Sequence, residues 1–230
     1  MLAAGEAGQK VPFVNRDLPD ALPAYRHFLD GNGAERTFSY ERYVRHHRSG
    51  EVTLRTMIRE GRHAAYDLWI ARRNRAQGTF QFTGTDINAG IEGSISMPYP
   101  STENWQKAIG GHDIWLSGTV SVGIPEIVTQ TECREGPPRF EMELTLHVED
   151  MYNFNPGQAD LATGIPDADN GRLATSGLGH QYLHKSTLVR TVAWQGQPSA
   201  APTVTAEPPS WRSGRRHRKP GDNRRLRNRI

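Results

Sequence analysis

The spacing of hydrophobic residues changes once along this chain, from a helical to a strand period. In the first third, apolar side chains recur at steps of three and four, most clearly over residues 52–76. An interval of seven around Gly61 interrupts this run, and it is compatible with a kink or with two shorter helices. Shorter helical patterns precede it at 20–29 and around Tyr40, separated by the turn signal at 30–33. The first third is therefore predicted to be helical.

After Gly78 the period shortens to two, which is typical of β-strands. Residues 139–148 show it best, because apolar and polar side chains alternate there as in an antiparallel strand with one wet face. The other predicted elements are strands at 79–83, 91–97, 114–122 and 187–194, a hairpin at the loop 132–138, and helices at 101–109 and 171–185. Helices followed by an antiparallel sheet with a helical excursion predict an α+β fold.

Composition divides the chain into three parts. Residues 1–18 are predicted to be a flexible arm, 19–196 a single α+β domain, and 197–230 a disordered linker with a basic tail. The last 20 residues, 211–230, hold nine Lys/Arg and one acidic residue; the remainder has 19 basic and 24 acidic residues. The tail alone therefore turns a body of about −5 into a chain of +3. The tail is interpreted as a solvated extension, as a sequence accident, or as a contact for nucleic acid or anionic membranes.

Cysteine usage and the N-terminus bear on the compartment. Cys133 is the only cysteine, which excludes an intrachain disulfide and a metal site built on cysteines. The start of the chain has no basic region followed by an apolar run, and no segment approaches the roughly 18 apolar residues of a membrane span. We expect synthesis in the cytoplasm, with export through a specialised secretion system or on a larger polypeptide; the site of action stays open.

The segment 149–171, EDMYNFNPGQADLATGIPDADNG, is the most unusual part of the chain. Loops this long are uncommon in compact domains and are usually functional or disordered. Its candidate acid–base or ligand groups are Asp150, Tyr152, Asn155 and Asp160. Carboxylate oxygens suit calcium or magnesium, but the glycine spacing is not that of an EF-hand, and turn chemistry with a helix cap is the simpler interpretation.

Histidines supply the remaining candidates. His112, at a predicted tight turn, is interpreted as a general base or as a structural histidine. His180 and His184 are four residues apart on a predicted helix, a spacing that suits zinc with a third ligand from Asp160 or His147; two packed or exposed histidines are the alternative. No GxGxxG, P-loop, GxSxG or CxxC pattern occurs. The residues therefore define no cofactor.

Two pieces, YPSTENWQKAIGGHDIW and the region from DMYNFNPG to TLVRTVAW, resemble C-terminal domains of bacterial polymorphic toxins. Such domains are carried by Rhs, PAAR or VgrG-type proteins of contact-dependent or type VI secretion. The resemblance spans residues 25–194 and includes the opening HFLDGNG-x-x-x-TF. It implies an antibacterial effector with an immunity protein as a partner, and it carries over no catalytic residue.

A second resemblance is to the colicin M group, bacteriocins that hydrolyse lipid II at a site containing D-x-Y-D followed by a His-Arg pair. Asp150 and Tyr152 fit this motif, whereas Asn153 replaces the second aspartate. Ala159 and Asp160 stand where the His-Arg pair would fall, so the proton-transfer and phosphate-binding groups are missing from this stretch. The sequence by itself does not assign that activity.

Three functional hypotheses follow. The first is an antibacterial effector with an envelope target, acting through the five candidate residues at one edge of the sheet. The second is a non-enzymatic binding module, in which the acidic loop, Trp105 and Trp115 form the recognition surface. The third is nucleic-acid binding through residues 211–230, which the acidic body disfavours. Whether the chain is an enzyme stays open.

Overall fold

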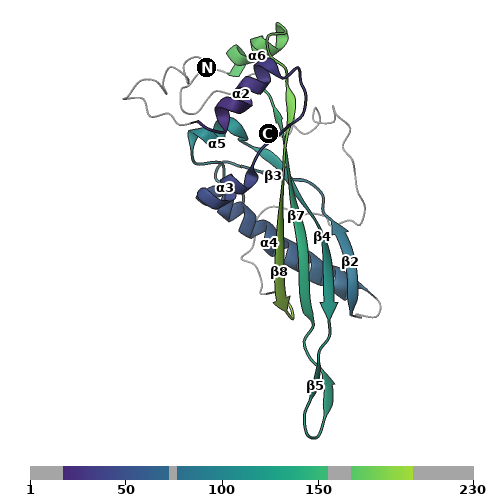
Figure 1. Ribbon diagram of the computed structural model, residues 1–230. Helices are drawn as coiled ribbons and strands as arrows, with labels where there is room; N and C mark the ends of the chain where they lie inside the picture. Colours follow the sequence, from purple (N-terminus) through teal and green to yellow (C-terminus); the bar gives the residue numbers. More distant parts are fainter. Residues whose placement is uncertain (1–17, 73–76, 155–166, 199–230) are drawn as a thin grey trace. The chain divides into compact units, whose positions relative to one another are not determined.

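The computed structural model describes residues 18–72, 77–154 and 167–198, without the side chains of 167–170 (Figure 1). The elements, in chain order, are α2 (Ala21–Asp30), β1 (Arg36–Thr37), α3 (Tyr40–His46), α4 (Arg48–Ala71), β2 (Gly78–Thr83), β3 (Ile87–Ala89), α5 (Glu103–Ala108), β4 (His112–Gly123), β5 (Glu126–Val128), β6 (Cys133–Glu135), β7 (Arg139–Tyr152), α6 (Asp167–Thr175) and β8 (Tyr182–Gln195). N-terminal helices are followed by a mostly antiparallel, mixed sheet and a short helix. The predicted α+β class is confirmed.

The main sheet has six strands in the order β1-β8-β7-β4-β2, with β3 also pairing with β4. β2 runs antiparallel to β4, whereas the two-residue strand β1 runs parallel to β8 and places Arg36 opposite His184. None of the described helices combines the length and apolar composition needed to cross a membrane.

The chain forms two compact units, each assembled from three segments. The first comprises Met1–Thr53, Asn88–Asp113 and Val148–Ser186, and the second comprises Leu54–Ile87, Ile114–His147 and Thr187–Ile230. The strands β4, β7 and β8 contribute one part to each unit. The boundaries of the single domain expected at 19–196 stay a prediction.

The core of the first unit is aromatic. α2 buries one face, and on it Phe28 contacts the rings of Tyr152 and Phe154 at centroid distances of 6.3 and 5.1 Å. The backbone of Gly179 lies against Phe28, so closely that a Cβ there would come within 2.4 Å of the ring. A glycine is therefore required at this position for α2 to dock.

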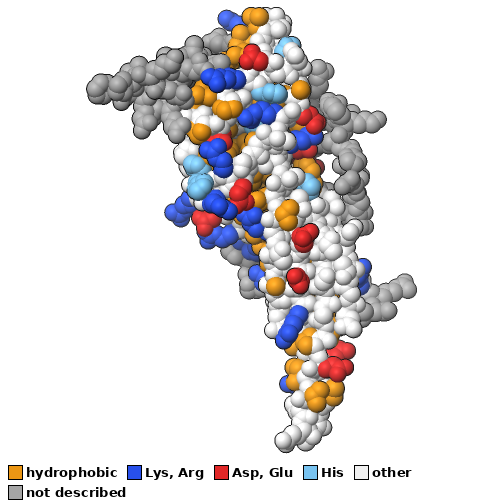
Figure 2. All heavy atoms as spheres, viewed as in Figure 1, with side chains coloured by type: hydrophobic (Ala, Val, Ile, Leu, Met, Phe, Trp, Pro, Cys, Tyr) orange, Lys and Arg blue, Asp and Glu red, His pale blue; other side chains and the backbone are white. Residues whose placement is uncertain are grey.

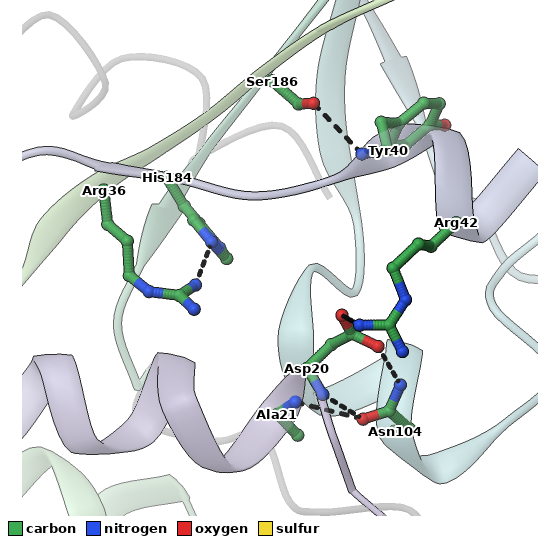
Figure 3. A network of polar contacts seen from close by, with 8 residues as sticks. All are labelled: Asp20, Ala21, Arg36, Tyr40, Arg42, Asn104, His184 and Ser186. Carbon is green, nitrogen blue, oxygen red and sulfur yellow. Dashed lines mark hydrogen bonds and ion pairs between the residues drawn. The ribbon is translucent and has the colours of Figure 1, made fainter.

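Asn104, at the start of α5, caps α2 from a distance of more than 80 residues (Figure 3). Its Oδ1 accepts the backbone N–H groups of Asp20 and Ala21 at 2.9 and 3.1 Å, and its Nδ2 donates to the Asp20 carboxylate at 2.8 Å. The first N–H groups of a helix have no partner inside the helix, and the Asp20 side chain makes no cap bond of its own. Asn104 therefore supplies the missing acceptor and holds α5 against α2.

Replacing Asn104 by alanine is expected to lower the free energy of unfolding by about 1–2 kcal/mol, because two N–H groups at the helix start lose their acceptor. Urea denaturation measures this loss. Glu103→Ala, one residue earlier, removes a partly buried ion pair with Lys107 and is expected to cost about 0.5 kcal/mol, the value of an i,i+4 pair on a helix. Equal losses in the two variants would contradict the capping role.

The second unit packs α4 on the sheet around stacked aromatic rings. Phe140 of β7 stacks on Trp194 of β8 at 4.8 Å, and Trp69 of α4 meets Phe140 edge-on at 5.5 Å. α4 runs without interruption through Gly61, so the interpretation as two helices is wrong. A Cβ at Gly61 would lie 3.0 Å from Leu116 Cδ1, so that side chain would have to shift by a few tenths of an ångström to admit an alanine.

The strand predicted at 91–97 is wrong. The strand of this region is β3, and Ile91 makes only an isolated bridge to Pro98. Gly90 and Gly93 have φ of 70° and 73°, in the left-handed region that ends an extended run.

The helix predicted at 171–185 is also wrong in extent. α6 ends at Thr175, Gly177 follows with φ of 75°, and β8 begins at Tyr182. The final strand is therefore longer than the predicted 187–194, and it includes His184.

β7 lies next to β4 in the main sheet, as the expected hairpin requires, but the connection between them carries β5 and β6, so residues 133–135 form a strand instead of a loop. β5 and β6 pair with each other in a separate two-stranded sheet in which every residue is exposed. Figure 2 shows hydrophobic and acidic side chains on it, and Val128 is the most exposed of its large apolar residues.

Candidate functional site

Three polar side chains, Arg36, His184 and Asp150, form a row across adjacent strands of the first unit. Arg36 on β1 lies opposite His184 on β8, and Arg36 Nη1 is 2.6 Å from His184 Nε2 (Figure 3). On the neighbouring strand β7, Tyr152 stacks on Tyr182 of β8 at 5.1 Å. Asp150 and His184 are each two positions from one of these tyrosines, and side chains alternate along a strand. Asp150 and His184 therefore share the face that carries the stacked rings.

The charges of Arg36 and Asp150 both affect the pKa values of Tyr152 and Tyr182. Burial raises the pKa of Tyr152 well above its ordinary value, the charge of Asp150 raises it further, and that of Arg36 lowers it. Burial also raises the pKa of Tyr182, against the charge of Arg36 and with that of Asp150. Both phenols stay neutral, and the Tyr182 hydroxyl donates to the Ala24 carbonyl at 2.8 Å. Arg36 and Asp150 therefore act on the same two rings.

His184 is neutral and serves to hold Arg36. A guanidinium has only donors, so Nε2 accepts from Arg36, and Nδ1 carries the proton that points to the Ala108 carbonyl at 3.2 Å. Burial, and then the charge of Arg36, lower the pKa of His184 to about 3. With its lone pair occupied, this imidazole orients the guanidinium and does not accept protons.

Arg36 and Asp150 are the accessible members of the cluster, since both are half-buried whereas His184, Tyr152 and Tyr182 are buried. A guanidinium fixed on one side by a histidine still offers donors to a phosphate or carboxylate group. A nearby carboxylate can accept a proton from water. The cluster can therefore bind an oxyanion and assist hydrolysis next to it.

The five predicted site residues fall in different places. Asp150 and Tyr152 lie in the cluster, Tyr152 as a buried ring and Asp150 at its accessible side. Asn155 and Asp160 lie outside the described residues. His112 begins β4. The catalytic roles of all five stay predictions.

His112 has the surroundings of a structural histidine. It is 5% exposed, its Nε2 accepts from the Tyr40 hydroxyl at 2.9 Å, and its Nδ1 donates to the Gly110 carbonyl at 3.0 Å. Burial lowers its pKa to about 4. Both ring nitrogens are engaged inside the protein, an arrangement that favours the structural interpretation.

The two buried histidines predict acid sensitivity. Below their ordinary pKa of 6.5, His112 and His184 gain protons in the unfolded chain but not in the folded one, whose values are about 4 and about 3. Stability is then expected to fall between pH 6.5 and about 4, by about 1.4 kcal/mol per pH unit for each histidine. Urea denaturation at pH 7 and pH 5 measures this, and the slope should be shallower in His112→Gln. Equal stability at the two pH values would contradict the neutral, buried state.

The zinc hypothesis for His180 and His184 loses its geometric basis. His184 lies on a strand and not on a helix, and Arg36 occupies its Nε2. Of the proposed third ligands, His147 belongs to the other unit and Asp160 is outside the described residues. Among the residues that the structure describes, no group of three or more His, Cys, Asp or Glu side chains could hold a metal ion.

The binding-module hypothesis loses one of its two tryptophans. Trp105 is 1% exposed and packs against Tyr43 at 5.1 Å in the first unit. Trp115 belongs to the second unit and stacks on His147 at 4.8 Å with nearly parallel rings. Trp105 is therefore a core residue that no partner can reach.

Sequence reasoning missed Arg36. It lies in the stretch HFLDGNG-x-x-x-TF that carries part of the toxin resemblance, but at one of its variable positions. The pairing of a two-residue strand with a histidine 148 positions away brings it to His184, on the strand next to the one that carries Asp150. No local pattern could have shown this contact.

Comparisons with known proteins give a distant structural likeness. No protein-family model and no curated protein sequence matches the chain. The chain shows structural likeness to PaeM, a colicin M-like bacteriocin of Pseudomonas aeruginosa (12% identity, TM-score 0.39, 77% of this chain and 51% of that one). It also resembles the bacteriocin syringacin M of Pseudomonas syringae (16%, 0.40, 76% and 52%) and pectocin M2 (16%, 0.34, 85% and 63%).

The matched parts span about half the length of the first two bacteriocins and under two thirds of the third. At these low identities and TM-scores the likeness does not establish a shared function. The function has to be argued from the cluster itself.

Proposed function

We propose that this chain is an antibacterial, bacteriocin-like toxin domain that hydrolyses a phosphate-linked precursor of the cell envelope. The observation that carries the proposal is the row of Arg36, His184 and Asp150 across three adjacent strands. A cation held in place beside an accessible carboxylate suits the charge of a phosphoryl group and the deprotonation of water.

The proposed reaction has three parts. The guanidinium of Arg36 binds the non-bridging oxygens of the phosphoryl group and stabilises the charge that develops on them. The carboxylate of Asp150 accepts a proton from the attacking water, whose oxygen forms the new bond to phosphorus. The bond from phosphorus to the leaving oxygen breaks, and that oxygen takes a proton from solvent. His184 keeps Arg36 in position throughout.

The resemblance to the colicin M group gives the substrate class. The D-x-Y part of its motif is present as Asp150 and Tyr152, whereas the chain lacks the His-Arg pair shortly after it. In the fold, His184 and Arg36 lie beside these two residues although they come from distant parts of the chain. This replacement supports a lipid-linked pyrophosphate such as lipid II as the substrate. An immunity protein in the producing cell and an envelope site of action belong to the same proposal.

Inducible expression in a bacterium, with and without a periplasmic signal peptide, tests this function. We expect growth arrest and lysis when the protein is periplasmic, and relief of both by Asp150→Asn, which keeps the side-chain shape but removes the charge. Glu141→Gln, an exposed substitution on the same strand, is the matched control and should remain toxic. Toxicity only in the cytoplasm, or toxicity that Asp150→Asn leaves intact, would reject the proposal.

A further inference from the structure

Two buried donors in the second unit lack hydrogen-bond partners. Among the described residues, neither Arg62 Nε on α4 nor Trp194 Nε1 on β8 has an acceptor, although both atoms are buried. Trp194 is 9% exposed. Buried polar groups in folded proteins are almost always paired, so an unpaired buried N–H calls for a partner such as a water or an ion.

The two donors belong to one contact. The guanidinium carbon of Arg62 lies 5.5 Å from the centroid of the Trp194 ring, in cation–π geometry. No ion pair joins Arg62 to a carboxylate within the described ranges, and Arg59, one turn earlier, already pairs with the neighbouring Glu60 at 3.3 Å. The positive charge of Arg62 is therefore not neutralised by the side chains around it.

The indole is held rigidly, which fixes the direction of its N–H group. Phe140 stacks on Trp194 at 4.8 Å with an interplanar angle of 4°, and Trp69 meets Phe140 edge-on at 5.5 Å. After Trp194 the backbone is tied down, because Gly196 N–H donates to the Pro138 carbonyl at 2.8 Å. A donor fixed in this way needs no reorganisation when a ligand binds.

We propose that Arg62 and Trp194 form a binding site for an oxyanion, a carboxylate or a phosphate group. Two N–H donors beside one positive charge suit an acceptor that carries a negative charge. The site is built from second-unit residues alone, and it does not depend on the function proposed for the Arg36 cluster.

Heteronuclear NMR of the indole N–H groups tests this site in the full-length protein. The chain has five tryptophans, and Trp194→Phe identifies the cross-peak of Trp194. Sodium phosphate and sodium acetate are titrated in turn, replacing sodium chloride at constant ionic strength. We expect a saturable downfield shift of the Trp194 proton. Saturation by phosphate only, by acetate only or by both supports the site and names its preferred ligand.

Variants of α4 provide the controls. Arg62→Gln is expected to weaken the saturating anion by about tenfold or more, since a charged hydrogen bond is lost. Arg59→Gln, on the same helix, should leave the midpoint within about twofold, the variation expected of a distant surface charge. Arg62→Lys retains the charge without the guanidinium fork and should also bind more weakly. A shift that rises without saturation, no shift, or equal binding in Arg62→Gln would overturn the proposal.

Discussion

Replacing Arg36 by glutamine is expected to reduce killing by periplasmic protein by about 100-fold or more, the usual loss when one fixed donor to a reacting oxyanion is removed. The residue is half-buried, and its partner His184 stays in place through the bond to the Ala108 carbonyl. The fold should therefore survive. Dose–response curves of induction against viable count measure the loss, and thermal unfolding checks the fold.

Two further variants separate charge from geometry. Arg36→Lys keeps the positive charge but not the planar fork, so an intermediate loss is expected. Arg134→Gln removes an arginine from the exposed hairpin β5–β6 and should kill like the wild type. Full killing by Arg36→Gln would show that the cluster does not act on the target.

Replacing Trp105 by alanine is expected to lower the free energy of unfolding by about 3–5 kcal/mol, the range for large aromatic residues in a core. Its ring is 1% exposed and contacts the rings of Tyr43 and His47. A domain of this kind has about 5–15 kcal/mol of stability in total, so the variant should be close to unfolding at 37 °C. Chemical denaturation followed by circular dichroism measures the change.

Trp115→Ala is the informative comparison, because this ring is only half-buried and stacks on His147 from one side. A clearly smaller loss, about half or less, is expected from its smaller burial. A stable Trp105→Ala variant with altered partner binding would restore the binding-module hypothesis.

Elements with strong local periodicity could be predicted from the sequence. The strand β7 buries its apolar residues at regular steps, where the spacing puts them. The helix α4 forms where its period predicts, but Thr53 and Thr56 are buried beside Met57 whereas Leu54 and Ile58 are only half-buried. The start of β8 could not be predicted in this way. Its buried positions Tyr182, His184 and Ser186 are polar or amphipathic side chains, so the hydrophobic pattern did not extend to them and the segment was interpreted as helix.

The residues of the candidate site also differ in whether local sequence could predict them. Asp150 and Tyr152 stand out locally, because they end a regular strand and begin an acidic segment. The placement of Asp150 and Arg36 around the same two tyrosines depends on three strands meeting in register, and one of those strands has only two residues. His112 drew attention as a titratable residue at a turn, but its contacts with Tyr40 and Gly110 come from tertiary packing. Local spacing singled out Asp150 as a candidate and could not single out Arg36.

Hydrolysis of a lipid-linked envelope precursor by purified protein tests the central claim most directly. Lipid II carrying a radiolabelled peptidoglycan headgroup is incubated with wild-type protein, Asp150→Asn or Glu141→Gln, and the soluble phosphorylated headgroup is separated from the lipid. The account predicts release by the wild type and by Glu141→Gln. With Asp150→Asn the rate should fall by about 100-fold or more, as for loss of a general base. No release by the folded wild-type protein, or equal release by Asp150→Asn, would contradict it.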